Sequence, residues 1–440
     1  MEPIIALATP PLKSALALIR TSGDNIFTIT SSIFSKDICN TSNREIFFGE
    51  IKNGSEVIDQ VVLLVYPHPN SNTGEDVVEI CCHGSMIIVD QIIQLYLSKG
   101  VRYATRGEFT SRAYLNGKMD LIEAEAVNDL INATTIEAKN LSLLSLKGET
   151  SSLFIPIKEK ISYLLALLET NIDFPEYEDI REVNFEKVAV DCKDIKESID
   201  ELISQGEEGK LVKEGIKIAI VGEPNVGKSS LLNALLKEDK AIVSSIPGTT
   251  RDIVEGDINL AGIPLHILDT AGIRETKDEI EEIGVQRSEK SINESDLIIL
   301  VIDPRDKDND KNKEILSKTE GKRRIIVYNK SDLVSKKDEG IYISAINNDI
   351  NALTKEIIKV IKISDSAFSK PSFNNARQLG LLRRISALME EAISAVEEEI
   401  TSDIIASILL SAYNCSRELL GEDPTLDLTD EIFSRFCVGK

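Results

Sequence analysis

Cysteine is scarce in this sequence of 440 residues, and long hydrophobic runs are missing from it. Its 6 cysteines are too few for a disulfide framework. No apolar run approaches about 18 residues, which argues against a transmembrane helix. The first residues have neither the basic start and apolar core of a signal peptide nor an Arg-rich transit character. These absences predict a cytoplasmic protein that does not bind membranes.

Basic charge is also in deficit, with 50 Lys and Arg against 73 Asp and Glu. The net charge of −23 argues against a surface that grips nucleic-acid phosphate by itself. Any RNA contact is therefore expected to be local or supplied by a partner. The hydrophobic content of 42% and the charged content of 28% are typical of a globular protein. The length predicts about two to four domains.

The strongest motif is a glycine-rich loop between an apolar run at 216–221 and a segment with helical spacing. It reads Gly222-x4-Gly227-Lys228-Ser229, which is the spacing of a P-loop in its strand–loop–helix setting. The glycines let backbone N–H groups point at phosphate, and the following helix adds its positive end. Lys228 is expected to reach the β- and γ-phosphates, and the Ser229 hydroxyl to bind Mg²⁺.

Further polar segments follow and complete a GTP site. Gly248-Thr249-Thr250 lies in a polar loop, where Thr250 could complete the Mg²⁺ shell, and Asp269-Thr270-Ala271-Gly272 follows an apolar strand. In Asn329-Lys330-Ser331-Asp332, the Asp332 carboxylate can accept both the ring N–H and the exocyclic amine of guanine, which adenine cannot offer. Four motifs in this order predict a GTPase domain. The residues predicted to bind GTP are Asn225, Val226, Gly227, Lys228, Ser229, Ser230, Ser244, Ser245, Ile246, Pro247, Gly248, Thr249, Thr250, Asp269, Thr270, Ala271, Gly272, Asn329, Lys330, Ser331, Asp332, Ser344 and Ala345.

Two positions depart from the Ras-like plan. Ile273 follows Gly272, where many GTPases carry the glutamine that orients the attacking water. Another polar group must then act, and the acidic run at 275–282 offers candidates. Asn225 stands within the P-loop, and its amide oxygen could ligate a monovalent cation that does the electrostatic work of an arginine finger. Alternatively, Asn225 is only a turn residue of the loop.

Periodicity divides the rest of the chain. Residues 1–118 mix strand-like and helical stretches and fit an α+β domain, in which Arg20, Glu79, Arg112 and Lys118 taken alone fit surface or salt-bridge residues. Residues 211–366 alternate strands and helices, which predicts a mostly parallel sheet. The strands are expected at 216–221, 264–268, 297–302, 324–328 and 341–343, with a hairpin partner at 253–258.

Residues 119–210 and 367–440 both have helical spacing, and neither segment buries its apolar stripe alone. We expect them to pack together as one discontinuous helical domain with the nucleotide domain inserted between them. Two independent bundles are the alternative. The glycine-containing stretch 205–210 predicts a linker before the nucleotide domain.

With these motifs in view, the whole chain resembles the MnmE/TrmE family of tRNA-modification GTPases. The most specific marks are TGEDVVEI at 73–80 with CHG at 82–84, GEFT-RA-LNGKMDL at 107–121, DTAGIRET at 269–276 and the final FCVGK at 436–440. The resemblance implies an N-terminal folate-binding and dimerisation domain, a discontinuous helical domain and an inserted Ras-like G domain. It also implies a homodimer and a heterotetramer or larger complex with an FAD-dependent MnmG-type protein.

Together the two proteins would install an aminomethyl or carboxymethylaminomethyl group at carbon 5 of the wobble uridine of certain tRNAs. The resemblance implies a 5-formyl- or methylene-tetrahydrofolate donor, tRNA contact mainly through the partner, and hydrolysis that depends on K⁺. By motif, K⁺ would be held by Asn225, Ser244, Ile246 and Thr249, and Mg²⁺ by Ser229 and Thr250. Glu281 would position the water. The folate carrier would be bound by Arg20, Glu79, Lys118 and Lys440, and Cys437 falls on the family's terminal cysteine.

Two other function classes compete with this interpretation. A regulatory or ribosome-assembly GTPase would share the G domain, but it has no need for a carbon-carrier pocket. A pure folate-binding module would carry a degenerate G domain, and the intact motifs oppose that. The N-terminal blocks together with FCVGK favour the tRNA-modification GTPase.

Overall fold

The computed structural model describes residues 1–173, 184–238, 254–268, 291–306, 309–334, 339–361, 363–422 and 432–439. The chain divides into two compact units. The first comprises residues 1–128, 146–152 and 413–440, and the second comprises residues 129–145 and 153–412. Within the described ranges, no helix is both long enough and apolar enough to cross a membrane.

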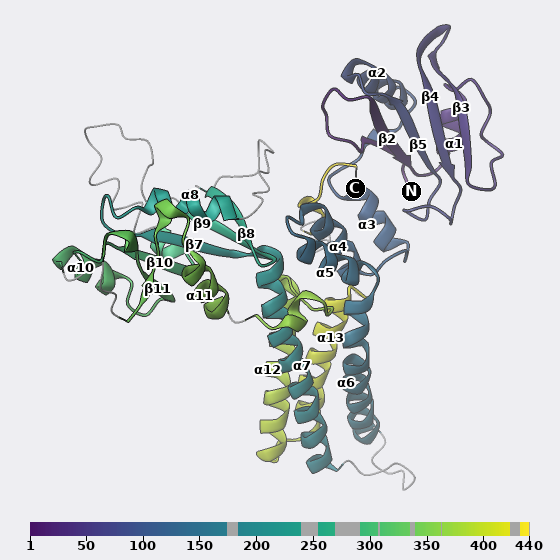
Figure 1. Cartoon of the computed structure of the whole chain (residues 1–440). Helices are drawn as coiled ribbons and strands as arrows, with labels where there is room; N and C mark the ends of the chain where they lie inside the picture. The colour runs from purple at the N-terminus through teal and green to yellow at the C-terminus, as the bar shows by residue number, and fades with distance from the viewer. Residues whose placement is uncertain are drawn as a thin grey trace. The chain divides into compact units, whose positions relative to one another are not determined.

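The first unit contains a six-stranded sheet of order β3-β4-β5-β2-β1-β6 (Figure 1). Neighbouring strands are antiparallel except for β1 and β6, which are parallel. The strands are β1 (Ile4–Leu7), β2 (Leu16–Ser22), β3 (Glu45–Asn53), β4 (Glu56–Tyr66), β5 (Val77–His83) and β6 (Arg102–Tyr103). The helices that lie wholly in this unit are α1 (Ile26–Ser31), α2 (Met86–Leu97) and α3 (Glu108–Leu115).

One face of this sheet carries the core of the unit. Alternate residues of β4, such as Val61 and Leu63, are buried together with Val89 and Ile92 of α2, because successive side chains of a strand point to opposite faces. On the other face, Ile46 and Phe48 of the edge strand β3 are 71% and 61% exposed.

The second unit contains a six-stranded sheet of order β12-β11-β10-β7-β9-β8. All neighbours are parallel except the hairpin β8–β9. The strands are β7 (Ile216–Val221), β8 (Val254–Leu260), β9 (Ile263–Leu268), β10 (Leu297–Ile302), β11 (Arg324–Tyr328) and β12 (Ile341–Tyr342), and the helices next to them in sequence are α8 (Lys228–Glu238), α10 (Asp310–Lys318) and α11 (Asn351–Ile361). The expected mostly parallel sheet and its antiparallel hairpin are therefore confirmed.

Long helices make up most of the remaining chain: α4 (Leu121–Asn132), α5 (Ile136–Leu146), α6 (Glu149–Asp173), α7 (Phe185–Glu214), α12 (Ala376–Glu397) and α13 (Ser402–Leu420). Helix α12 packs along α7, and Ser386 donates a hydrogen bond of 2.6 Å to Asp200 between them. Helices from the two sides of the G domain thus share one packed bundle, as a discontinuous helical domain requires.

The linker expected at 205–210 is wrong. These residues belong to α7, which continues unbroken to Glu214 and passes through Gly215 directly into β7 (Figure 1). A Cβ added at Gly206 would lie 2.2 Å from the carbonyl oxygen of Phe373, and one at Gly209 would lie 2.3 Å from Ser372 Oγ. These glycines therefore permit close approach of another segment to the helix, and they do not make the chain flexible.

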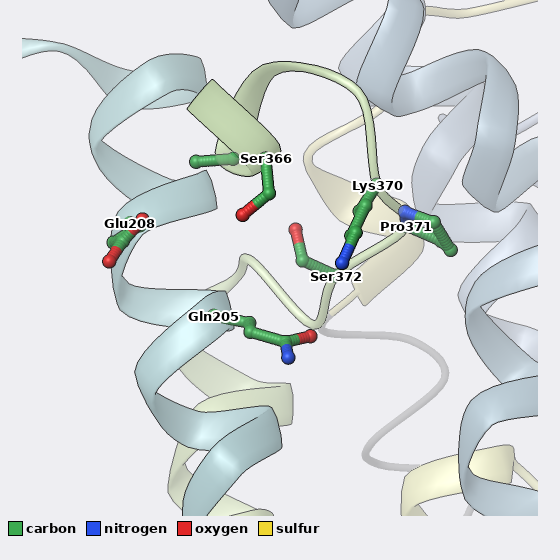
Figure 2. Close-up of a pocket in the computed structure, with 7 residues that line it drawn as sticks. Gln205, Glu208, Ser366, Lys370, Pro371 and Ser372 are labelled. Carbon is green, nitrogen blue, oxygen red and sulfur yellow. The ribbon is translucent and has the colours of Figure 1, made fainter. Parts of the chain in front are cut away.

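Figure 2 shows this place, where Gln205 and Glu208 of α7 lie opposite Ser366 and Ser372. The cavity between them has a volume of about 10 Å³. That is about the space that one water molecule needs, so this cavity is too small for an organic ligand. Glu208 accepts hydrogen bonds from the backbone N–H of Ser364 at 3.0 Å and from its hydroxyl at 2.5 Å, which fixes the returning segment on α7.

Candidate nucleotide site

The loop after β7 has the backbone geometry of a phosphate cradle. Gly222 and Gly227 have φ angles of 152° and 99°, which side chains of L-residues rarely adopt. A Cβ at Gly222 would lie 2.3 Å from the carbonyl oxygen of Val301, and one at Gly227 would lie 2.3 Å from Asn329 Nδ2. Glycine is therefore required at both positions for this loop to close on the start of α8.

Lys228 follows this loop as the first residue of α8. Its Nζ donates hydrogen bonds of 2.9 Å to the carbonyl oxygens of Gly222 and Glu223, and burial lowers the pKa of the amine. Ser229 opens the first turn of α8 with an exposed side chain. The loop thus presents an amine, a hydroxyl and the N-terminal end of a helix together, which suits phosphate and a bound Mg²⁺.

Asn329 joins three of the predicted nucleotide segments. Its side chain is 3% exposed, and its Nδ2 donates 2.8 Å to the carbonyl oxygen of Val226 in the P-loop. Its Oδ1 accepts 3.0 Å from the backbone N–H of Ala345. The carboxyl ends of the parallel strands β7 and β11 meet at this edge, where α/β sheets bind ligands.

Asp332 lies in the short 3₁₀ helix η1 (Ser331–Leu333) with its side chain exposed. Ser344 donates a hydrogen bond of 2.5 Å to Asp332 Oδ1, and the Asn347 side-chain amide donates 3.0 Å to the Ser344 hydroxyl. The carboxylate is therefore oriented by a chain of hydrogen bonds while it faces solvent. That is what recognition of a purine edge needs.

Sequence reasoning missed Asp303 and Arg305. Lys330 Nζ donates 2.7 Å to the carbonyl oxygen of Asn225 and pairs with Asp303 at 3.0 Å. Arg305 pairs with the same carboxylate at 2.6 Å, and its hydrogen bonds hold the pKa of Asp303 well below its usual range. A signal was available, because Asp303 directly follows the apolar run of β10 and so belongs to the edge that carries the P-loop.

A second cluster lies in the first unit. Arg20 and Glu79 face each other across β2 and β5 and form an ion pair of 2.6 Å, with both side chains 15% exposed. The Arg20 guanidinium also donates 3.1 Å to the carbonyl oxygen of Gly439 and lies 5.7 Å from the centre of the Phe109 ring. The salt-bridge expectation for Arg20 and Glu79 is confirmed. Phe109 and Gly439 are further members that the sequence did not identify.

Three other residues of this unit that were named from the sequence, the predicted folate-site residue Lys118 together with Cys437 and Arg112, are placed differently. Lys118 is exposed and lies beside Gly74, where an added Cβ would be 3.1 Å from Lys118 Cε. Cys437 has an exposed free thiol, and its backbone carbonyl oxygen accepts a hydrogen bond of 3.4 Å from the backbone N–H of Gly107. Arg112, by contrast, is buried and pairs with Glu75 at 2.9 Å, which confirms it as a salt-bridge residue.

Several predicted site residues lie outside the described part of the chain. They are Glu281, the loop residues Ser244, Ser245, Ile246, Pro247, Gly248, Thr249 and Thr250, the strand-end residues Asp269, Thr270, Ala271 and Gly272, and Lys440. Their assignments to GTP, Mg²⁺, K⁺ and folate stay predictions.

Two family models and several curated proteins match this chain. The family model described as the MnmE helical domain matches residues 121–437, and the one described as the GTP-binding protein TrmE N-terminus matches residues 3–118. The tRNA modification GTPase MnmE of Enterococcus faecalis is 38% identical over 457 residues, which cover 100% of this chain and 98% of the relative. The proteins of that name from Acholeplasma laidlawii and Bacillus subtilis are 39% and 36% identical, over 100% of this chain and 99% and 100% of their own lengths.

Among solved structures, Era of Aquifex aeolicus aligns at 28% identity over 40% of this chain and 67% of that chain. The TM-score is 0.27. A score of this size is too low to support any inference from the alignment.

Proposed function

The chain belongs to the MnmE family of tRNA modification GTPases, and from this premise we propose that it hydrolyses GTP to drive modification at carbon 5 of the wobble uridine of certain tRNAs. One observation carries this proposal beyond a generic GTPase. The same chain holds the guanine-nucleotide residues around Asn329 and, in its N-terminal domain, the cluster of Arg20, Glu79 and Gly439. A GTPase that only regulates assembly needs the first of these and has no use for the second.

At the nucleotide site, each residue type has a definite task. The P-loop backbone and Lys228 bind the phosphates, Ser229 and Thr250 complete the Mg²⁺ shell, and Asp332 reads guanine. Mg²⁺, when bound, would supply positive charge that offsets the charge of the phosphates. The positive φ angles of Gly222 and Gly227 support this fit, because no other residue type lets the backbone approach an anion so closely.

We further propose that hydrolysis uses a monovalent cation, K⁺, held by Asn225, Ser244, Ile246 and Thr249, with Glu281 positioning the attacking water. Asn225 supports this because its φ of 64° puts it at the left-handed bend of the P-loop, with the side chain exposed. Its carbonyl is held by Lys330, so the backbone from which that amide projects is fixed. Oxygen ligands of this kind suit a hard cation.

The N-terminal domain is proposed to bind a tetrahydrofolate that carries a one-carbon group, through Arg20, Glu79, Lys118 and Lys440. Two contacts support it. Besides its ion pair with Glu79, the Arg20 guanidinium lies over the Phe109 ring and donates a hydrogen bond to the carbonyl oxygen of Gly439. Gly439 is the residue before Lys440. Tyr66 adds a hydroxyl whose pKa is raised by burial and by the nearby Glu79 charge. The partly exposed Tyr66 ring together with these fixed charges suits a pterin ring with an acidic tail.

Arg20→Ala is expected to weaken binding of 5-formyl-tetrahydrofolate about tenfold or more, because a charged hydrogen bond in a partly buried site is lost. Arg20→Lys should be intermediate, since an ammonium cannot reproduce the bidentate, stacked geometry. Calorimetry with nucleotide-free protein measures both. Lys52→Ala, which removes a cation paired only with Glu50 on β3, is the control and should bind normally. Undiminished binding by Arg20→Ala would remove Arg20 from the pocket.

We propose a homodimer that uses the open face of the N-terminal sheet. Ile46 and Phe48 are exposed there, and their cross-strand partners Leu64 and Val62 are half-buried. These four residues form an apolar patch on the sheet face, which a second copy can cover. An MnmG-type protein is proposed to bring FAD and most of the tRNA contact, in a heterotetramer or larger complex in the cytoplasm. The net charge of −23 supports a partner that makes most of the tRNA contact, because an acidic surface repels tRNA phosphate.

A strain that lacks this gene tests the proposal. Mass spectrometry of its tRNA should show unmodified carbon 5 at the wobble uridine, restored by the intact gene and by Lys313→Ala, which alters only an exposed ion pair with Asp310. Lys228→Ala should restore nothing, because the phosphate-binding amine is gone. Normal wobble uridines together with immature ribosomal subunits would instead support the ribosome-assembly GTPase.

A further inference from the structure

We propose that Asp303 is a positioning residue for guanine nucleotides: it holds the Lys330 ammonium against the P-loop and so joins the guanine-reading loop to the phosphate loop. The inference rests on the proposed GTP site and adds a residue that none of its four motifs contains. Lys330 belongs to the motif at 329–332, and its side chain contacts that of Asp303 although the two residues are 27 positions apart in the sequence.

Lys330 bridges the guanine-reading loop and the P-loop, in addition to the hydrogen bond that Asn329 donates to Val226. It has a φ of 64°, and its Nζ donates 2.7 Å to the carbonyl oxygen of Asn225 and 3.0 Å to Asp303 Oδ2. The carbonyl is a neutral acceptor, so Asp303 is the charge that makes this position favourable for an ammonium. Asp303 is 7% exposed as a residue, and its pair with Lys330 is therefore only partly screened by water.

Arg305 fixes the orientation of the Asp303 carboxylate. Asp303 Oδ1 accepts from the backbone N–H of Arg305 at 3.1 Å and from its Nε at 3.0 Å, and Oδ2 accepts from Nη2 at 2.6 Å. A carboxylate held by its own turn cannot rotate away from Lys330.

Loss of the Asp303 charge should act on nucleotide affinity and spare the chemical step. An asparagine must turn its NH₂ group toward one of the two cations or leave one of them unpaired. Lys330 then keeps a single neutral acceptor, and bound nucleotide must order it. The free-energy cost of ordering Lys330 is the same in the ground-state and transition-state complexes, so both are destabilised equally.

The experiment measures release of fluorescent N-methylanthraniloyl-GDP and steady-state GTP hydrolysis by the full-length protein. Asp303→Asn should release GDP about tenfold faster, which corresponds to the loss of one charged hydrogen bond. The KM for GTP should rise in proportion, while kcat stays within about twofold. Asp310→Asn, an acid-to-amide change at an exposed pair with Lys313 on α10, is the matched control and should leave both values unchanged.

Two further variants separate positioning from a purely structural role. In Lys330→Met, adding Asp303→Asn should cause no further loss of affinity, because residues that act through one another are not additive. Arg305→Gln, at a side chain that is 49% exposed and so tolerant of change, should give a smaller effect in the same direction. A lower melting temperature with normal GDP release in Asp303→Asn, or additive losses in the double variant, would overturn the proposal. Failure of the wild-type protein to bind GDP would instead refute the proposed function.

Discussion

Replacing K⁺ by Na⁺ is expected to lower GTP turnover by about 10³-fold, the effect typical of removing a positive charge at the position where arginine fingers act. A smaller ion fits the same oxygen ligands poorly, so the exposed Asn225 amide and the 244–249 loop would no longer be held together. Turnover should recover in Rb⁺. If two G domains must pair, turnover should also rise more than linearly with protein concentration.

Glu281→Ala tests the other half of this mechanism. Ile273 cannot polarise water, and in the proposed mechanism the Glu281 carboxylate does so, so its loss should abolish hydrolysis while GTP and Mg²⁺ still bind. Glu282→Ala, the adjacent acid of the same run, is the matched control and should keep its activity. Stopped-flow binding and phosphate release measure the two properties separately. Equal turnover in Na⁺ and K⁺, or full activity in Glu281→Ala, would leave the mechanism without support.

Strands whose side chains are buried on both faces were predictable from sequence. The run at 297–302 coincides with β10, in which every residue is buried, because a central parallel strand needs apolar residues throughout. The sequence also allowed the hairpin β8–β9 through the segment Leu260-Ala261-Gly262, and in the structure Ala261 and Gly262 at its turn have φ angles of 52° and 88°. The residues of these segments themselves favour the strand or the turn, so such elements can be predicted from the local sequence.

Tertiary contacts decided the elements that sequence reasoning missed. The stretch 205–210 has linker composition, but it is helical, and Gly206 and Gly209 stand there because Phe373 and Ser372 leave no room for a Cβ. Strand β3 carries charged residues and Gly49, where an added Cβ would lie 2.6 Å from the Phe34 ring. In both cases the reason for the glycine lies in a distant part of the chain, which no local pattern reveals.

The candidate site divides in the same way. The residues of the P-loop and of the 329–332 segment form motifs of fixed spacing, and each motif directly follows an apolar strand. Both segments could therefore be found from the sequence. Asp303 has no motif, and its role depends on where Lys330 points. The pairing of Arg20 with Glu79 follows from the register of β2 and β5, and that register could not be derived from either strand alone.

Asp332→Asn is expected to weaken GTP binding at least tenfold, since a hydrogen bond to a charged group contributes roughly 1.5–3 kcal/mol. In the structure, Ser344 donates to Oδ1 of the carboxylate, which leaves Oδ2 to face the base. An amide keeps the oxygen that Ser344 needs, so its NH₂ group would take the place of Oδ2. It would then meet the exocyclic amine of guanine, donor against donor.

The same geometry predicts a change of specificity, because xanthine has a carbonyl where guanine has that amine. Xanthosine triphosphate should therefore gain affinity for Asp332→Asn while GTP loses it, and competition against N-methylanthraniloyl-GDP measures both. Asp310→Asn controls for the loss of one negative charge and should retain the preference for GTP. Ser344→Ala should weaken both nucleotides without exchanging their order, since it frees the side chain at 332 to rotate but leaves its chemistry intact. Unchanged GTP affinity in Asp332→Asn, or a loss for both nucleotides alike, would show that another residue reads the guanine edge.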